Sequence, residues 1–335
     1  MKPVPLSVLD QSPIRAGGTA ADAIRETVVL AGLCEQWGYH RYWVAEHHAS
    51  SGFAGCSPEV MLARLGAETS HIRIGSGGVM LPHYSPYKVA ENFRLLAAMY
   101  PGRMDLGVGR APGSNQFISS VLAYGSPVGP EYFPAKVADL QAFLHDTTPH
   151  TPGLENARAY PVVDTIPELW MLGSSEESAL LAARMGLPYS FAHFINPAID
   201  TGIFDIYRER FQPGACLEKP HTLLCVSMVC ADTEEEARRL SLSRKLWFAS
   251  LANQHGDRAF PSVEEAEQHI YNDREQALLD SHFRTALAGT PEQVRTELLE
   301  MAQRFGADEL MVVSITYDFE ARCRSHQLLA EIWNS

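Results

Sequence analysis

Residues 41–81, RYWVAEHHASSGFAGCSPEVMLARLGAETSHIRIGSGGVML, decide the fold of this chain. The stretch opens with an apolar, aromatic run at 41–45 and closes with a second apolar run at 72–81 that is rich in glycine at its far end. Between the two runs, residues 58–69 have the spacing of a helix, and Ser57 or Pro58 marks the start of that helix. Two apolar strands joined by an amphipathic helix predict a pair of parallel strands.

The same alternation of strand and helix continues outward in both directions. Residues 145–167 predict an irregular excursion, and residues 253–283 predict a polar insertion with one helical patch. Eight strand-helix units without a break in composition favour an α/β fold, a single closed (β/α)₈ TIM barrel over residues 1–335, with insertions after strands four and seven. We expect the strands at 5–10, 41–45, 72–81, 104–108, 169–172, 189–193, 223–231 and 309–315, and the helices at 19–37, 58–69, 86–99, 134–144, 176–185, 199–211, from 233 onward and at 290–305.

The composition excludes several classes of partner. The net charge of -13 repels nucleic acid and anionic lipid, so neither is expected to bind. The six cysteines include no CxxC pair, which argues against a zinc or dithiol site. The amino terminus lacks the apolar stretch of a signal peptide, and no later segment could span a bilayer. We therefore expect a cytoplasmic protein.

Three titratable residues, Glu46, His47 and His48, directly follow the second strand. The active site of a TIM barrel lies at the carboxyl-terminal ends of its strands, so this is a candidate position for a catalytic base or for metal ligands. The alternative is that these side chains satisfy one another by hydrogen bonds at the rim. Strand alternation places His47 opposite its two neighbours, so the three are not expected to bind one ion.

Glycines interrupt the end of the third strand, where Gly77 and Gly78 belong to the run GSGG at 75–78. Glycine weakens a strand interior, so this run indicates either a flat ligand pressed against the backbone or a tight bend at the barrel rim.

Two further segments suggest an anion site. The fourth strand runs into a loop that presents Arg110, a permanent cation for a phosphate or carboxylate, unless it forms a structural salt bridge. The fifth strand ends in GSSEES at 173–178, where Ser174, Ser175 and Ser178 surround a predicted helix amino terminus. Free N–H groups and the helix dipole make such a terminus an anion site, although plain capping explains the serines equally well. Together, Arg110 and this turn favour a bound monophosphate.

Four motifs in series resemble the bacterial-luciferase-like flavin monooxygenases. They are Glu46-His47-His48, GSGGVMLP at 75–82, YPGRMDLGVGR at 100–110 and LGSSEESALLAARMGLP at 172–188. The resemblance implies that His47 is catalytic, with Glu46 among the cofactor-binding residues beside it. It also implies that the backbone of Gly77 and Gly78, joined by a non-proline cis peptide, packs on the flavin ring. Arg110, Ser174, Ser175 and Ser178 would bind the flavin phosphate.

The implied function is a monooxygenase that uses reduced FMN and O₂ to oxidise a small organic substrate. Because no second nucleotide-binding fold is left over, a separate NAD(P)H:flavin reductase would supply the reduced flavin, and a homodimer is expected. Two alternatives remain: hydride transfer with the deazaflavin F420, and a non-catalytic flavin-binding protein. His47 would pass protons because an imidazole titrates near neutrality.

The sequence also departs from the family. Gly109 stands where the luciferase catalytic subunit has a reactive cysteine, and Ser174 where it has an acidic residue, which puts light emission in doubt. The insertion at 253–283 shows no clear similarity to the luciferase lid, so substrate identity does not transfer. Tyr84, Phe117, His193 and Phe194 are candidates for an apolar substrate pocket or for the core.

Overall fold

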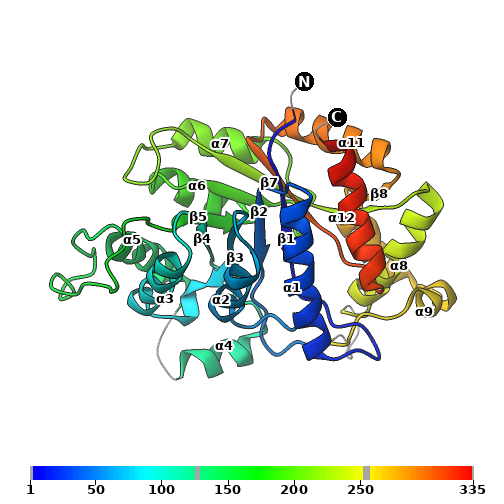
Figure 1. Cartoon of the computed structure of the whole chain (residues 1–335), viewed down its shortest axis with the longest axis horizontal. Coiled ribbons are helices and arrows are strands. Elements are labelled where there is room, and N and C mark those ends of the chain that lie inside the picture. The colour runs from blue at the N-terminus through cyan, green and yellow to red at the C-terminus, as the bar shows by residue number, and fades with distance from the viewer. Residues whose placement is uncertain (1–2, 125–128, 252–256, 334–335) are drawn as a thin grey trace.

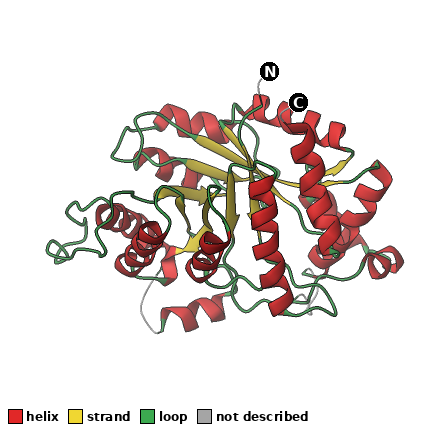
Figure 2. Cartoon of the chain, viewed as in Figure 1, coloured by secondary structure: helices red, strands yellow, loops and turns green. Residues whose placement is uncertain are grey.

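The computed structural model describes residues 3–124, 129–251 and 257–333. Eight parallel strands form a closed barrel in the order β1-β2-β3-β4-β5-β6-β7-β9, with β9 paired back to β1. Figure 1 shows helices surrounding these strands, and Figure 2 shows the loops that join them. The predicted TIM barrel is confirmed. The strands are β1 (Leu6–Asp10), β2 (Arg41–Val44), β3 (Arg73–Met80), β4 (Met104–Gly109), β5 (Glu168–Gly173), β6 (Tyr189–Ala192), β7 (Thr222–Cys230), β8 (Leu287–Gly289) and β9 (Glu309–Val313).

The helices follow the strands in the predicted alternation, with additional ones in the insertions. They are α1 (Ala20–Gln36), α2 (Pro58–Glu68), α3 (Pro86–Met99), α4 (Gln116–Ala123), α5 (Phe133–Leu144), α6 (Glu176–Arg184), α7 (Gly202–Arg210), α8 (Glu234–Ser250), α9 (Val263–Gln268), α10 (Asp273–His282), α11 (Pro291–Phe305) and α12 (Phe319–Trp333), with short 3₁₀ turns η1 (Leu81–His83) and η2 (Pro130–Tyr132). No helix in the described ranges is both long and apolar enough to cross a membrane.

Local sequence explains where α11 begins and ends. Thr290 and Gln293 form a capping box at its start, so that each side chain accepts a hydrogen bond from the other residue's backbone N–H. Gly306 ends the helix with a positive φ of 61°, a conformation that glycine adopts at little steric cost. The sequence predicts both ends of this helix correctly.

Four features differ from the sequence-based expectation. The helix that follows the last barrel strand, α12, was not predicted. The insertion at 253–283 contains two helices rather than one patch, while its residues 253–256 lie outside the described part. The short α4 was not predicted; its apolar residues recur at helical spacing, yet the structure buries none of its residues. The three-residue β8, which pairs with the far end of β7, is too short for a strand pattern.

Strand alternation divides the core into two regions. Side chains such as Tyr42 and Ile74 face outward and pack under the helices. Side chains such as Leu9, Trp43 and Met311 face inward and fill the barrel. The inner region therefore forms the floor beneath any ligand bound at the carboxyl-terminal mouth.

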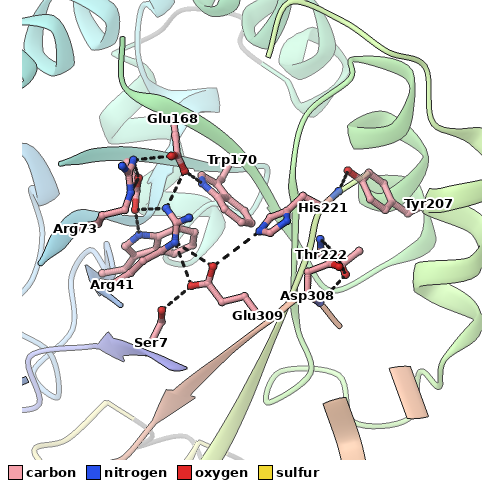
Figure 3. Close-up of polar contacts among 12 residues, drawn as sticks. Ser7, Arg41, Arg73, Glu168, Trp170, Tyr207, His221, Thr222, Asp308 and Glu309 are labelled. Carbon is pink, nitrogen blue, oxygen red and sulfur yellow. Dashed lines mark hydrogen bonds and ion pairs between the residues drawn. The ribbon is translucent and has the colours of Figure 1, made fainter. Parts of the chain in front are cut away.

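Charged side chains at the amino-terminal ends of several strands form one connected group of polar contacts (Figure 3). The guanidinium of Arg41, at the start of β2, lies 2.8 Å from carboxylates of Asp105 and Glu168 and 3.1 Å from Glu309. These carboxylates raise the pKa of Arg41. Against the effect of burial, Arg41 lowers the pKa of Glu168, and a hydrogen bond with His221 together with Arg41 lowers the pKa of Glu309. Ser7 donates a hydrogen bond of 2.6 Å to Glu309. Every charge in this group has an opposite partner within the chain.

Candidate functional site

A cavity of about 590 Å³ opens at the carboxyl-terminal ends of the strands. Its floor is formed by inward-facing barrel residues, among them Trp43, Cys225 and Met311. Six of the eight predicted site residues line it: Gly77, Gly78, Arg110, Ser174, Ser175 and Ser178. The structure therefore brings the ends of β3, β4 and β5 to one cavity, while Glu46 and His47 are not among its lining residues.

The peptide bond between Gly77 and Gly78 is cis, as predicted. A Cβ atom on Gly77 would lie 2.5 Å from a methyl carbon of Leu9, and one on Gly78 would lie 2.7 Å from the carbonyl oxygen of Gly107. The backbone of β4 thus excludes a side chain at Gly78, whereas a side chain at Gly77 would require the end of Leu9 to shift. The glycines leave a bare backbone surface facing the cavity, and close packing of the barrel already requires the second of them.

Arg110 follows the end of β4 and forms an ion pair with Glu177, with 2.5 Å between Nη1 and Oε2. Both side chains are substantially exposed, at 48% for Arg110 and 70% for Glu177. An ion pair this exposed contributes about 0–1 kcal/mol and opens readily. The structure thus shows the salt bridge that the sequence left open, and it also leaves Arg110 at the cavity wall.

The first turn of α6 forms the adjacent wall. Ser175 is the residue that precedes the helix, and its backbone N–H donates to Ser178 Oγ at 3.4 Å. Ser178 Oγ donates to the Ser175 carbonyl oxygen at 2.6 Å, and it lies 3.0 Å from the hydroxyl of Tyr189. Helix capping and the cavity wall therefore involve the same serines. The amino terminus of α6 and Arg110 together supply N–H donors and positive charge suited to a phosphate.

Glu46 connects three segments at the rim rather than lining the cavity. One carboxylate oxygen accepts a hydrogen bond of 2.6 Å from the hydroxyl of Tyr84, and the same oxygen lies 2.6 Å from His48 Nε2. The other oxygen accepts from the backbone N–H of Met80 at 2.9 Å. Glu46 thereby fixes the end of β3, and His48 is held beside it. This is the rim arrangement that the sequence left as an alternative for these two residues.

His47 lies on the opposite side from its neighbours, as strand alternation predicts. Its ring stacks on Phe53 with centroids 4.3 Å apart, and its Nδ1 atom is buried without a hydrogen-bond partner in the described structure. Burial, with the nearby His48, lowers the pKa of His47 to about 4. The imidazole is therefore neutral at pH 7, whereas the sequence predicted titration near neutrality. In the described residues, no group of three or more His, Cys, Asp or Glu side chains could hold a metal ion.

Sequence reasoning found the polar wall but missed most of the apolar floor. Of the four aromatic candidates, only Phe194 lines the cavity. Tyr84 is bound to Glu46, Phe117 is exposed, and His193 is buried against Phe305. The inward-facing positions Trp43, Cys225 and Met311 could have been found by strand alternation, once the side that faces inward was known.

The fold and the cavity define an α/β barrel with a ligand site at its carboxyl-terminal mouth. The model of the family described as luciferase-like monooxygenase matches residues 4–309. The chain belongs to this family, as its motifs suggested.

Relatives and solved structures agree with this assignment. The chain is 39% identical to the N-acetyl-S-alkylcysteine monooxygenase of Bacillus subtilis (strain 168) over 332 residues, which cover 97% of each protein. The crystal structure of apo-MsnO8 is 40% identical, with a TM-score of 0.90 and 98% of each chain covered. The oxygenating constituent of 3,6-diketocamphane monooxygenase from Pseudomonas putida, solved in complex with FMN, is 17% identical with a TM-score of 0.73. That match covers 99% of this chain and 98% of the other, and it shows the shared fold.

Proposed function

We propose that this protein is a monooxygenase that uses reduced FMN and O₂ to oxidise a small organic substrate. The observation that carries the proposal is the convergence of a bare backbone surface, a cation and a helix amino terminus on one cavity of about 590 Å³. This donor set fits a flat ring that bears a phosphate: Gly77 and Gly78 beside the ring, and Arg110 with Ser174, Ser175 and Ser178 at the phosphate. When bound, reduced flavin supplies the two electrons needed to divide O₂ between the substrate and water.

The chain's own residues would bind, shield and relay protons. Binding of the phosphate requires Arg110 to leave Glu177 or to share its donors with both groups. The apolar floor around Trp43 and Met311 would exclude water from the reacting atoms. His47 is neutral, so one ring nitrogen accepts a proton while the other can release one. We propose that His47 passes a proton in this way, without becoming charged, and that Glu46 positions the rim beside it.

Incubation with ¹⁸O₂ tests the proposal. The full chain is mixed with chemically reduced FMN, and N-acetyl-S-methylcysteine serves as the first substrate because a relative is named for that class. The expected product carries one ¹⁸O atom, as detected by mass spectrometry. Parallel reactions contain F420 or no protein. Reduction of F420 by the substrate, with no labelled product from FMN, would favour hydride transfer. Binding of FMN without oxidation of any compound in a panel would favour a flavin-binding protein.

The source of reduced flavin is tested separately. The described strands and helices build one barrel and its insertions, with no second nucleotide-binding fold among them. We therefore propose that a partner NAD(P)H:flavin reductase supplies reduced FMN. The protein with FMN and NADH or NADPH alone is expected to show no turnover, and addition of a purified flavin reductase is expected to start it. Turnover without the reductase would overturn this part of the proposal.

A further inference from the structure

Arg244 differs from the other buried arginines. Within the described ranges, four arginines are buried, and three of these have carboxylate partners. The three form these ion pairs: Arg41 with Asp105, Glu168 and Glu309, Arg94 with Asp146, and Arg322 with Asp10 and Glu26. Arg244, on α8, has no ion pair with a described residue, and the residues outside the described part include no aspartate or glutamate.

The surroundings of Arg244 are polar or aromatic but carry no negative charge. Its guanidinium donates a hydrogen bond to Ser227 Oγ and lies 5.4 Å from the ring centroid of Phe283. Burial, together with Arg244 itself, lowers the pKa of the adjacent His282 to about 4, so that ring is neutral at pH 7. Burial lowers the pKa of Arg244 only to about 10. The guanidinium therefore stays charged at neutral pH, and a buried charge without an opposite partner is costly to maintain.

Arg244 also lies next to the large cavity. Ser227 is two residues beyond Cys225 on the same face of β7, and Cys225 lines that cavity. Phe194 lines both the large cavity and the recess that contains Ser227 and Arg244. The backbone N–H of Phe194 donates to the Cys225 carbonyl oxygen at 3.2 Å, which holds Phe194 beside β7. The side chain of Phe194 thus separates the cavity from the guanidinium.

We propose that Arg244, with Ser227, binds a carboxylate of the substrate once the side chain of Phe194 turns aside, while the part of the substrate that is oxidised occupies the large cavity. This inference rests on the proposed function, because it assigns the anion to the substrate of that site. Arg244 would then be a residue that determines specificity for anionic substrates. Its planar fork of donors matches the two oxygens of a carboxylate.

The position and charge of this site distinguish it from the phosphate site. Arg110 follows β4 and α6 follows β5, whereas Ser227 is on β7, so β6 lies between the two positions. Arg244 is the one residue with a permanent charge among those described that line the recess, and a single cation balances a monoanion such as a carboxylate. A flavin phosphate, which is close to a dianion, fits the exposed Arg110 and the helix terminus better.

Calorimetric titration of the full chain in the presence of FMN tests this inference with two matched probes. N-acetyl-S-methylcysteine carries the carboxylate, and its primary amide is neutral and of the same shape. The wild type is expected to bind the acid about 10- to 150-fold more tightly than the amide, the range for a hydrogen bond to a charged group. Arg244→Met is expected to abolish this preference with little change in amide affinity. Arg238→Met, an exposed substitution on the same helix, is the matched control and should keep the preference.

Thermal unfolding provides a second measurement that separates binding from folding. Arg244→Met removes an uncompensated charge and should leave the midpoint of unfolding unchanged or raise it, unlike removal of a structural arginine. Three results would each overturn the inference. They are equal affinities of the wild type for the acid and the amide, no binding of the acid, and a preference for the acid that survives in Arg244→Met. A preference for the acid without its oxidation would contradict the proposed function but support the carboxylate site.

Discussion

The two ends of the barrel differ in how their charged side chains are paired. At the amino-terminal end, Arg41 is surrounded by the carboxylates of Asp105, Glu168 and Glu309. At the carboxyl-terminal mouth, Arg110 has one exposed partner and Arg244 has none among the described residues. A charge that is neutralised within the chain stabilises the fold, whereas a charge left without a buried partner is available to a ligand. We infer that the first end maintains the barrel and that the second end is the site of function.

The largest expected effect is at the mouth, on turnover. His47→Ala should lower turnover about 10²–10⁴-fold, the usual share of general acid-base catalysis, with FMN affinity nearly unchanged. Steady-state rates with reduced FMN and a substrate of the wild type measure this effect. His71→Ala, at a largely exposed histidine, is the control and should retain full activity. Normal turnover in His47→Ala would show that this ring has only a structural role.

The next effect is at the amino-terminal end, on stability. Arg41→Met removes the cation that three carboxylates share and should lower the free energy of unfolding by about 3–5 kcal/mol, because two of them, Asp105 and Glu309, stay buried. Arg238→Met, at an exposed ion pair, should change it by less than about 1 kcal/mol. Urea denaturation compares the two variants. Similar stabilities would mean that the charged group does not maintain the barrel.

Removal of the cation at the mouth should affect binding and leave stability unchanged. Arg110→Ala is expected to weaken FMN binding by about 1.5–3 kcal/mol, the range for hydrogen bonds to a charged group. Its urea midpoint should match the wild type, since its ion pair with Glu177 is exposed. Arg184→Ala, at the other end of α6, is the control. FMN affinity that does not change in Arg110→Ala, as measured by flavin fluorescence, would remove Arg110 from the phosphate site.

Mild acid should also distinguish the two ends. The pKa of folded His47 is lowered to about 4, so the unfolded chain binds a proton first, and this stability is lost as the pH falls from about 6.5 toward 4. The pKa values of Glu168 and Glu309 are lowered, so their contribution is lost only below about 4.5. His47→Gln should therefore reduce the slope of unfolding free energy between pH 6.5 and 5 by at most about 1.4 kcal/mol per pH unit. An unchanged slope would show that His47 is not buried in its neutral form.

The smallest expected effect concerns the partner of Arg110. Glu177→Gln frees the guanidinium and removes a negative charge near the phosphate position, so FMN should bind up to about fivefold more tightly, equivalent to about 1 kcal/mol. The same fluorescence titration measures it, with Glu176→Gln as the neighbouring control. Weaker FMN binding in Glu177→Gln would mean that the ion pair positions Arg110 instead of competing with the phosphate.

The sequence predicted the barrel and most of the polar wall, because strand-helix alternation and short motifs at strand ends are local patterns. It could not predict that Glu46 binds Tyr84 and the Met80 backbone, since this contact depends on how the end of β3 approaches β2. The pKa of His47 depends on burial beside Phe53, which no local pattern reports. Arg244 is an ordinary helix residue in the sequence, and only the three-dimensional structure shows that it has no carboxylate partner among the described residues.

Binding of FMN compared with riboflavin tests most directly whether the mouth is a site for a flavin phosphate. The two ligands share the ring and differ in the phosphate, so the wild-type chain needs no substitution. Arg110 and the α6 terminus predict that FMN binds about 10- to 150-fold more tightly than riboflavin in a fluorescence titration. Equal affinities for the two ligands, or no binding of FMN, would contradict the account.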